Sequence, residues 1–197
     1  MGGESEEKRR EVPSIEQLES ELKRERYQKQ YGAVMRSTIY TLITVAAIAI
    51  LVATLWLPVF QTYGSSMTPT LEDGDIVVYL KSSELEKGDI IAFYYNNKIL
   101  VKRVIATSGE WIDIKPDGSV YVNNQEIVEP YIDKKAFGDC NIELPYQVPE
   151  SRIFVMGDHR EISVDSRNTA VGCVAEEQIA GELVFRVWPL ESFGMLK

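Results

Sequence analysis

Residues 38–60 read TIYTLITVAAIAILVATLWLPVF, a stretch that contains no charged side chain. A helix of about 20 apolar residues can span the hydrocarbon core of a bilayer. Tyr40 and Trp56 lie near its ends, where aromatic rings favour the membrane interface, and Pro58 predicts the helix end. A buried soluble helix would show a polar stripe, and a cleaved secretory signal would be shorter. The stretch therefore predicts an uncleaved transmembrane anchor over residues 37–60.

Basic residues flank this anchor unevenly. A group of them precedes it, namely Lys23, Arg24, Arg26, Lys29 and Arg36. After it, no Lys or Arg occurs before Lys81. Because basic flanks remain in the cytoplasm, this asymmetry predicts a cytoplasmic N-terminus and places residues 61–197 outside the cell membrane.

Residues 1–36 form a charged tail dominated by Glu, Lys and Arg. Ser14 and Gln17 have capping-box spacing directly after Pro13, and apolar residues recur on one helical face behind them. The pattern predicts a helix over residues 14–31 that could continue into the anchor. The apolar stripe is too short for a coiled coil, so a solvated charged helix is favoured.

Short β-branched or alternating runs follow the anchor and predict a single, mainly antiparallel β domain over residues 61–197. Predicted strands cover residues 75–80, 89–95, 99–105, 111–114, 120–122, 153–156 and 182–188. Turn dipeptides such as Asp117-Gly118 separate them, and Asn96-Asn97 predicts a hairpin. No helix–strand alternation is visible, which argues against a parallel α/β sheet.

The composition excludes several classes of function. A formal net charge of -9 argues against nucleic acid as a partner, because phosphate binding needs a basic surface. The single His159 and two distant cysteines, Cys140 and Cys173, argue against a metal site, and no cofactor is expected. For the two cysteines, one disulfide and two free thiols are equally compatible with the sequence.

Three segments could carry chemistry: YGSSMTPTLEDGD at 63–75, VKRV at 101–104 and MGDHREISVDSR at 156–167. Taken alone, the first is typical of a loop and the third of a solvated charge run. If residues 99–105 form a strand, Val101 and Arg103 share one face and Lys102 and Val104 the other. On spacing alone, an edge strand with both cations solvated is the favoured interpretation of the second segment.

A serine nucleophile in these segments would need a base. His159 is the only histidine, so a triad could use no other. A lysine can serve instead if burial lowers its pKa from about 10.4 towards neutrality, as in Ser-Lys variants of the triad.

Together the three segments resemble bacterial type I signal peptidases of the Gram-positive type, over the anchor and nearly all of residues 61–194. The matching motifs follow the family's order: Gly64-Ser65-Ser66-Met67, Pro69-Thr70-Leu71, Gly74-Asp75, Gly88-Asp89, Lys102-Arg103-Val104, Met156-Gly157-Asp158, Ser163 and Asp165-Ser166-Arg167. The resemblance implies a β-rich peptidase fold and a membrane-anchored serine endopeptidase. Its partners would be the lipid bilayer and the signal peptides of secreted preproteins, cut after small P1 and P3 residues.

The resemblance also implies individual roles. Ser66 would be the nucleophile and Lys102 its general base. Ser163 would hydrogen-bond and orient Lys102. In support, Asp165 and Arg167 would form one ion pair behind the site, and Asp158 would pair with Arg103.

Substrate would bind along Gly64, Met67, Leu71 and Val101, adding as a strand to edges near 61–66 and 99–101. Some family members carry a serine at the position of Gly64, so here the oxyanion would depend on backbone donors such as the Ser66 N–H. His159 stands where the family usually has asparagine, and is interpreted as a supporting or surface residue.

Two alternatives are open at this point. One is a specialised relative that processes a dedicated substrate such as a pilin. The other is an anchored β domain that binds peptides without cutting them, although Ser66 and Lys102 both stand in motif context.

Overall fold

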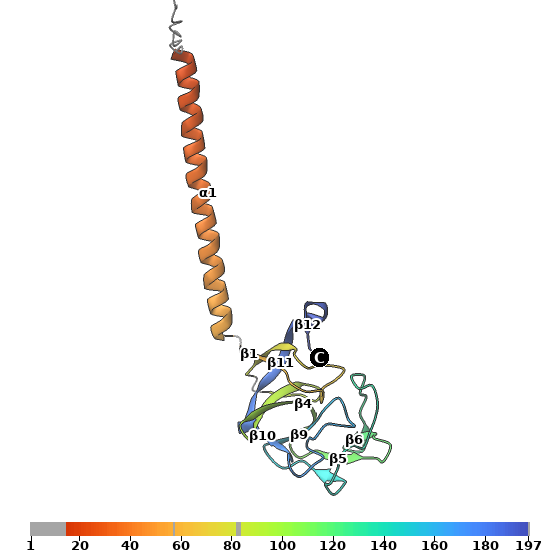
Figure 1. Cartoon of the computed structure of the whole chain (residues 1–197). Helices are drawn as coiled ribbons and strands as arrows, with labels where there is room; N and C mark the ends of the chain where they lie inside the picture. Colours follow the sequence, from red (N-terminus) through yellow and green to blue (C-terminus); the bar gives the residue numbers. More distant parts are fainter. Residues whose placement is uncertain (1–14, 57, 82–83, 197) are drawn as a thin grey trace, which may run out of the picture. The chain divides into compact units, whose positions relative to one another are not determined.

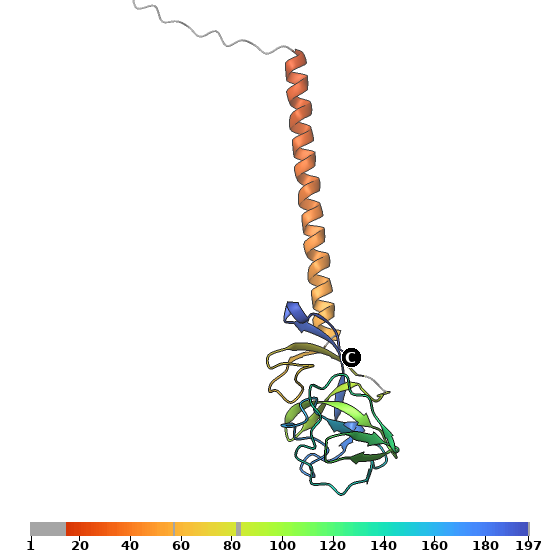
Figure 2. The ribbon, with the colours of Figure 1, turned by 90° about the vertical axis from the view of Figure 1, so that its right-hand side faces the viewer.

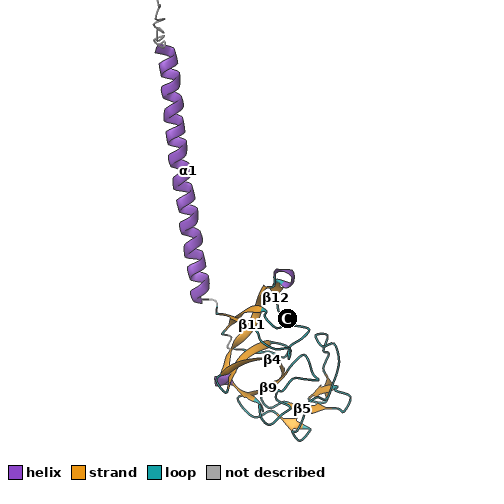
Figure 3. Ribbon diagram, viewed as in Figure 1, coloured by secondary structure: helices purple, strands orange, loops and turns teal. Residues whose placement is uncertain are grey.

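A computed structural model of the chain describes residues 15–56, 58–81 and 84–196. The chain divides into two compact units, one ending at Ala53 and the other beginning at Thr54. The first is helical, and the second, here called the β unit, is built from antiparallel strands (Figures 1 and 3).

All described residues of the helical unit belong to α1, a single α-helix from Ile15 to Trp56 that runs three residues past the boundary of the unit. At 1.5 Å per residue its 42 residues extend about 63 Å. The predicted 14–31 helix and residues 37–56 of the predicted anchor are therefore one element; Ser14 and Leu57 lie outside the described residues. The predicted anchor extends too far, because Val59 and Phe60 belong to the strand Val59–Gln61. The window Val34–Leu51 is long and apolar enough to cross a bilayer.

The larger sheet of the β unit has the order β1-β2-β11-β3-β4-β9-β10, with β12 paired to β11, and every pairing is antiparallel. Its strands are β1 (Val59–Gln61), β2 (Ile76–Leu80), β3 (Ile90–Tyr95), β4 (Lys98–Ala106), β9 (Arg152–Met156), β10 (Val174–Ala175), β11 (Ile179–Trp188) and β12 (Gly194–Met195). The order shows that segments distant in sequence, such as β4 and β9, are direct neighbours.

The smaller sheet has the order β7-β6-β5-β8 and is also antiparallel. Its strands are β5 (Trp111–Ile114), β6 (Val120–Val122), β7 (Gln125–Glu126) and β8 (Tyr146–Gln147). Two 3-10 turns, η1 (Glu176–Gln178) and η2 (Leu190–Ser192), flank β11. In two views at right angles, β12 lies at one end of the β unit and the smaller sheet at the other (Figures 1 and 2).

The predicted mainly antiparallel β fold is confirmed, and all seven predicted strands are present with bounds that differ from the expected ones by at most three residues. The predicted Asn96-Asn97 hairpin joins β3 to β4, with φ of 45° and 61° at the two residues. The strands that sequence reasoning missed are β1, β7, β8, β10 and β12. They are two or three residues long, too short to show a periodic pattern.

Strand β4 corrects one prediction. It lies between β3 and β9, and β9 pairs with its second half, from Arg103 to Ala106. In the described sheet Val101 and Lys102 pair with β3 alone, so the edge is real there, but the predicted exposure of both cations to solvent is wrong. Lys102 is 3% exposed and Arg103 is 1% exposed. Val101 and Val104 nevertheless pack into different apolar clusters, as strand alternation predicts.

Apolar packing joins the two sheets. Ile105 and Ala106 of β4 and Phe154 and Met156 of β9 pack against the smaller sheet in one buried cluster. The inner residues of the smaller sheet in this cluster are Ile112, Ile114, Val120 and Val122. The C-terminal end of β4 and the neighbouring residues of β9 therefore pack against the smaller sheet as well as belonging to the larger one. This packing fixes the segment after β9 relative to β4.

A buried ion pair tests this packing. Arg160 and Glu129 form an ion pair with each other, and both side chains are fully shielded from water. Removing one partner of a buried pair leaves an uncompensated charge. We expect Glu129→Ala to lower the free energy of unfolding of the full chain by about 3–5 kcal/mol, measured by urea unfolding in detergent micelles.

The matched control is Glu161→Ala. Glu161 pairs with Lys134 at 3.6 Å on the surface, and both side chains are more than half exposed. Its loss should change the free energy of unfolding by less than about 0.5 kcal/mol. Equal effects of the two variants would contradict the burial argument.

Candidate active site

The loop between β1 and β2 holds Ser66 in a short bridged segment. The backbones of Thr62 and Asp75 meet at 2.8 Å at its base, and the Gly64 N–H donates to Asp73 Oδ1 at 2.7 Å. Gly64 has a φ of +90°, a conformation that residues with a Cβ rarely adopt. The loop therefore turns at Gly64 and enters the core through Met67 and Leu71, which are both buried.

Ser66 and Lys102 meet across this loop. Lys102 Nζ lies 2.6 Å from Ser66 Oγ. Burial lowers the pKa of Lys102 to about 8, because the interior disfavours the charged ammonium; nearby Arg167 lowers it further, whereas Asp165 and Asp158 oppose the shift. The amine is therefore partly uncharged near neutral pH and within hydrogen-bonding distance of a hydroxyl.

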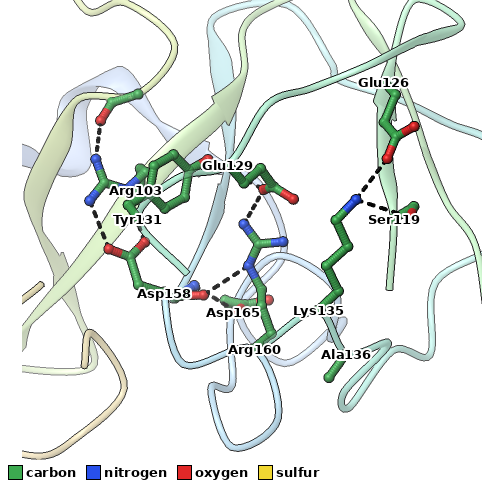
Figure 4. Close-up of polar contacts among 12 residues, drawn as sticks. Arg103, Ser119, Glu126, Glu129, Tyr131, Lys135, Ala136, Asp158, Arg160 and Asp165 are labelled. Carbon is green, nitrogen blue, oxygen red and sulfur yellow. Dashed lines mark hydrogen bonds and ion pairs between the residues drawn. The ribbon is translucent and has the colours of Figure 1, made fainter. Parts of the chain in front are cut away.

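Arg103 and Asp158 form a buried, two-pronged ion pair beside the loop (Figure 4). Arg103 Nε and Nη2 donate to the two Asp158 oxygens at 2.9 and 2.7 Å. Arg103 also donates to the Gly88 carbonyl at 2.6 Å and stacks on the Tyr131 ring at 3.9 Å. Thr70 donates to Asp158, which ties the Ser66 loop to this pair.

Asp165 and Arg167 form a second buried, two-pronged pair, at 2.8 and 2.9 Å. Asp165 also accepts the Gly157 N–H at 2.9 Å, and Arg167 donates to the Phe137 carbonyl. Each member of the pair therefore hydrogen-bonds a backbone group, Asp165 that of Gly157 and Arg167 that of Phe137, and the pair holds the segment after β9 in place.

Ser163 is buried here, but its hydroxyl does not bond Lys102. Within the described residues, Ser163 Oγ has no hydrogen-bond partner. A Cβ added to Gly157 would lie 2.5 Å from the Ser66 carbonyl oxygen and closer still to Ser163 Oγ. Only the backbone of Gly157 lies between the Ser163 hydroxyl and the Ser66 loop. Lys102 Nζ points to Ser66 instead of Ser163.

His159 is half-buried beside the Ser66 loop. Its ring Nδ1 lies 2.8 Å from Thr68 Oγ1, and its backbone N–H donates to the Ser66 carbonyl at 3.1 Å. Among the described residues, the His159 ring bonds Thr68 and not Ser66 Oγ, the atom that Lys102 contacts.

A groove of about 470 Å³ opens at the Ser66–Lys102 pair. Two chain segments line it, the β1 end with the following loop and the first half of β4. All four residues that the sequence predicts for substrate binding line this groove, namely Gly64, Met67, Leu71 and Val101.

Sequence reasoning missed several residues around the site. Tyr131 and Glu129 belong to a loop with no periodic signal, and their contacts with Arg103 and Arg160 are long-range. Arg186 of β11 donates to Asp75 at 2.8 Å and to the Thr70 carbonyl at 3.1 Å, bracing the Ser66 loop from a distant strand. Cys140 and Cys173 are both free thiols.

The family model described as "Signal peptidase, peptidase S26" matches residues 35–188. Signal peptidase IB of Staphylococcus aureus (strain COL) is 39% identical over 150 residues, which cover 66% of this chain and 77% of that protein. Signal peptidase I of Bacillus amyloliquefaciens is 35% identical over 169 residues, covering 79% and 86%.

Among solved structures, a signal peptidase I from Enterococcus faecalis V583 aligns with 27% sequence identity and a TM-score of 0.44, covering 51% of this chain and 97% of that one. The family model spans the Ser66 loop, β4 and the segment after β9 in one match. The chain therefore belongs to the signal peptidase family, peptidase S26, and is a serine peptidase.

Proposed function

We propose that this protein is a membrane-anchored serine endopeptidase that removes N-terminal signal peptides from secreted preproteins, with Ser66 as nucleophile and Lys102 as general base. The observation that carries the proposal is the 2.6 Å contact between Ser66 Oγ and the buried Lys102 Nζ. A buried amine with a pKa of about 8 can accept a proton near neutral pH, which a solvated lysine cannot do. The family of the chain supports the same reaction class.

The chemistry follows from this pair. Uncharged Lys102 takes the Ser66 hydroxyl proton as Oγ attacks the scissile carbonyl carbon. The Ser66 N–H donates to the oxyanion that forms. The Lys102 ammonium then protonates the leaving amine, which leaves an acyl-enzyme on Ser66. A water molecule, deprotonated by Lys102, hydrolyses that ester and restores both groups.

The groove supports an extended peptide as substrate. Its two walls come from the β1 end and from residues 98–102 at the start of β4, so a peptide strand can add along them. Alternate side chains of such a strand point into the groove. Met67 and Leu71 are buried at its floor and Val101 is half-buried, which leaves space for small P1 and P3 side chains.

The part of α1 from residue 37 to Trp56 supports a single-pass anchor, between a cytoplasmic tail (1–36) and an extracytoplasmic peptidase domain that includes all of β1. Many apolar side chains of the window Val34–Leu51 are exposed, a surface that lipid would cover. Hydroxyls of Thr38, Thr41 and Thr44 donate to carbonyls four residues back, which satisfies them without water. Basic residues on the N-terminal flank favour a cytoplasmic N-terminus.

The first test removes each member of the pair in the full chain. Ser66→Ala, Lys102→Ala and Lys102→Arg should each reduce preprotein cleavage by about 10⁴-fold or more, because nucleophile and base act as one unit. Lys102→Arg keeps a cation, but a guanidinium stays protonated and cannot act as a base.

Cleavage is measured with a panel of preproteins in detergent or liposomes. Lys115→Arg is the matched control, since Lys115 is an exposed lysine in the turn after β5 and lies outside the groove. Substantial cleavage by Ser66→Ala or Lys102→Ala would refute the pair. Cleavage of one preprotein alone would indicate a dedicated processing enzyme.

The pH dependence tests the base. Below the Lys102 pKa of about 8 the amine is increasingly protonated, so kcat/KM should rise about tenfold per pH unit and level off above pH 8. The measurement is the pH–rate profile of a peptide substrate without groups that titrate in this range. A profile that is flat between pH 6 and 9 would contradict the assignment.

Burial of the Lys102 amine should also lower the free energy of unfolding. Its pKa is 10.5 when unfolded and about 8 when folded, so the unfolded state holds the proton more tightly. The cost is complete below pH 8, at roughly 3 kcal/mol, and vanishes above pH 10.5. Lys102→Met should therefore raise the free energy of unfolding by about 1–3 kcal/mol at pH 7 while abolishing cleavage.

Urea unfolding of wild type and Lys102→Met, at pH 7 and pH 10, measures this difference. The advantage of the variant should shrink at the higher pH. A variant that is less stable than wild type at pH 7 would show that the lysine is a structural residue whose charge is fully compensated.

A further inference from the structure

The peptide group between Ser65 and Ser66 is held by Thr68. The Ser65 carbonyl accepts hydrogen bonds from the Thr68 N–H at 3.3 Å and from Thr68 Oγ1 at 2.9 Å. In a planar trans peptide the carbonyl and the following N–H point in opposite directions. Fixing the Ser65 carbonyl therefore fixes the direction of the Ser66 N–H, which finds no acceptor within the part of the chain that the structure describes.

His159 completes a chain of hydrogen bonds to this peptide group. Thr68 has one hydroxyl proton, which it donates to the Ser65 carbonyl. The 2.8 Å contact with His159 can then be a hydrogen bond only if the imidazole Nδ1 carries a proton. This series of hydrogen bonds runs from His159 Nδ1–H to the Thr68 hydroxyl and on to the Ser65 carbonyl. It is intact in the neutral Nδ1–H tautomer and in the imidazolium.

The backbone of His159 holds the next peptide group. Its N–H donates to the Ser66 carbonyl at 3.1 Å, and its own carbonyl accepts the Ser163 N–H at 3.1 Å. Gly157 packs directly against the same Ser66 carbonyl. The Ser65 carbonyl is thus held by two groups of Thr68 and the Ser66 carbonyl by the His159 N–H, so neither peptide plane can rotate without breaking a hydrogen bond.

We infer that Thr68 and His159 are positioning residues that lock the Ser65–Ser66 peptide so that the Ser66 N–H remains aimed at the developing oxyanion. The inference rests on the proposed function, in which that N–H is the donor. It matters in this chain because Gly64 supplies no side-chain donor, so the orientation of one backbone N–H carries the stabilisation. Lys102 and the Ser66 hydroxyl are not involved in the lock.

Kinetics of the full chain separate this role from structure or binding. Thr68→Val keeps the shape and removes the hydroxyl; kcat should fall about 10- to 100-fold, less than the complete loss of an oxyanion donor, with KM within about twofold. Thr68→Ser should restore most of kcat. His159→Leu should resemble Thr68→Val, whereas His159→Asn should stay near wild type, because its Nδ2–H can donate from the position of Nδ1.

The double variant Thr68→Val with His159→Leu should be no slower than the slower single variant, since both break one chain of bonds. Thr169→Val is the control and should match wild type, because Thr169 is exposed and lies outside the groove. Wild-type kcat in Thr68→Val, or a change confined to KM, would overturn the inference. If Ser66→Ala still cleaves, the proposed function itself has failed, and that outcome is distinct.

Inhibition by a peptide aldehyde provides a second test. Its hemiacetal with Ser66 places a tetrahedral oxygen where the oxyanion forms, so its inhibition constant should weaken in Thr68→Val by about the same factor as kcat. Unchanged inhibition alongside a reduced kcat would contradict the lock.

The tautomer can be observed directly. The chain contains a single histidine, so long-range ¹H–¹⁵N spectra of the full chain in micelles assign its two ring nitrogens without ambiguity. We expect a protonated Nδ1 in the neutral ring. A neutral ring protonated at Nε2 would reverse the chain of hydrogen bonds and overturn the inference, whatever the activity of the variants.

Discussion

The removal of one lysine amine from water is the constraint around which this structure is arranged. The interior disfavours a charged ammonium, and burial therefore lowers the pKa of Lys102 to about 8. The same burial brings Nζ to the Ser66 hydroxyl. In the proposed mechanism, this loss of stability allows one amine to exchange a proton near neutral pH, and such trade-offs are common at functional sites.

The surrounding charges are organised so that they do not cancel this effect. Asp158 and Asp165 both lie close enough to raise the lysine pKa, yet each is bound in two places by an arginine. An arginine stays protonated and matches a carboxylate geometrically. Each carboxylate is therefore largely neutralised by its own partner, and the net influence on Lys102 remains smaller than that of desolvation.

Much of this could be predicted from the sequence. The anchor, the seven longer strands and the segments that meet at the site carry local signals: an uncharged run, β-branched alternation and turn dipeptides. The burial of Lys102 was not predicted from spacing, because the burial of β4 depends on its neighbour β9, some fifty residues away in sequence. The Tyr131 and Glu129 contacts, and the missing Ser163–Lys102 bond, depend on loop geometry that leaves no periodic trace.

The register of β4 between β3 and β9 has a kinetic consequence for the enzyme itself. Ser66 and Lys102 are 36 residues apart, and the segment that anchors the Ser66 carbonyl arrives only with β9. Local order in any one hairpin cannot assemble such a site, because loop closure must precede the contacts that reward it. A chain in which β9 has not yet paired with β4 lacks the segment that holds the Ser66 loop, so the proposed active site cannot be complete before that long-range pairing forms.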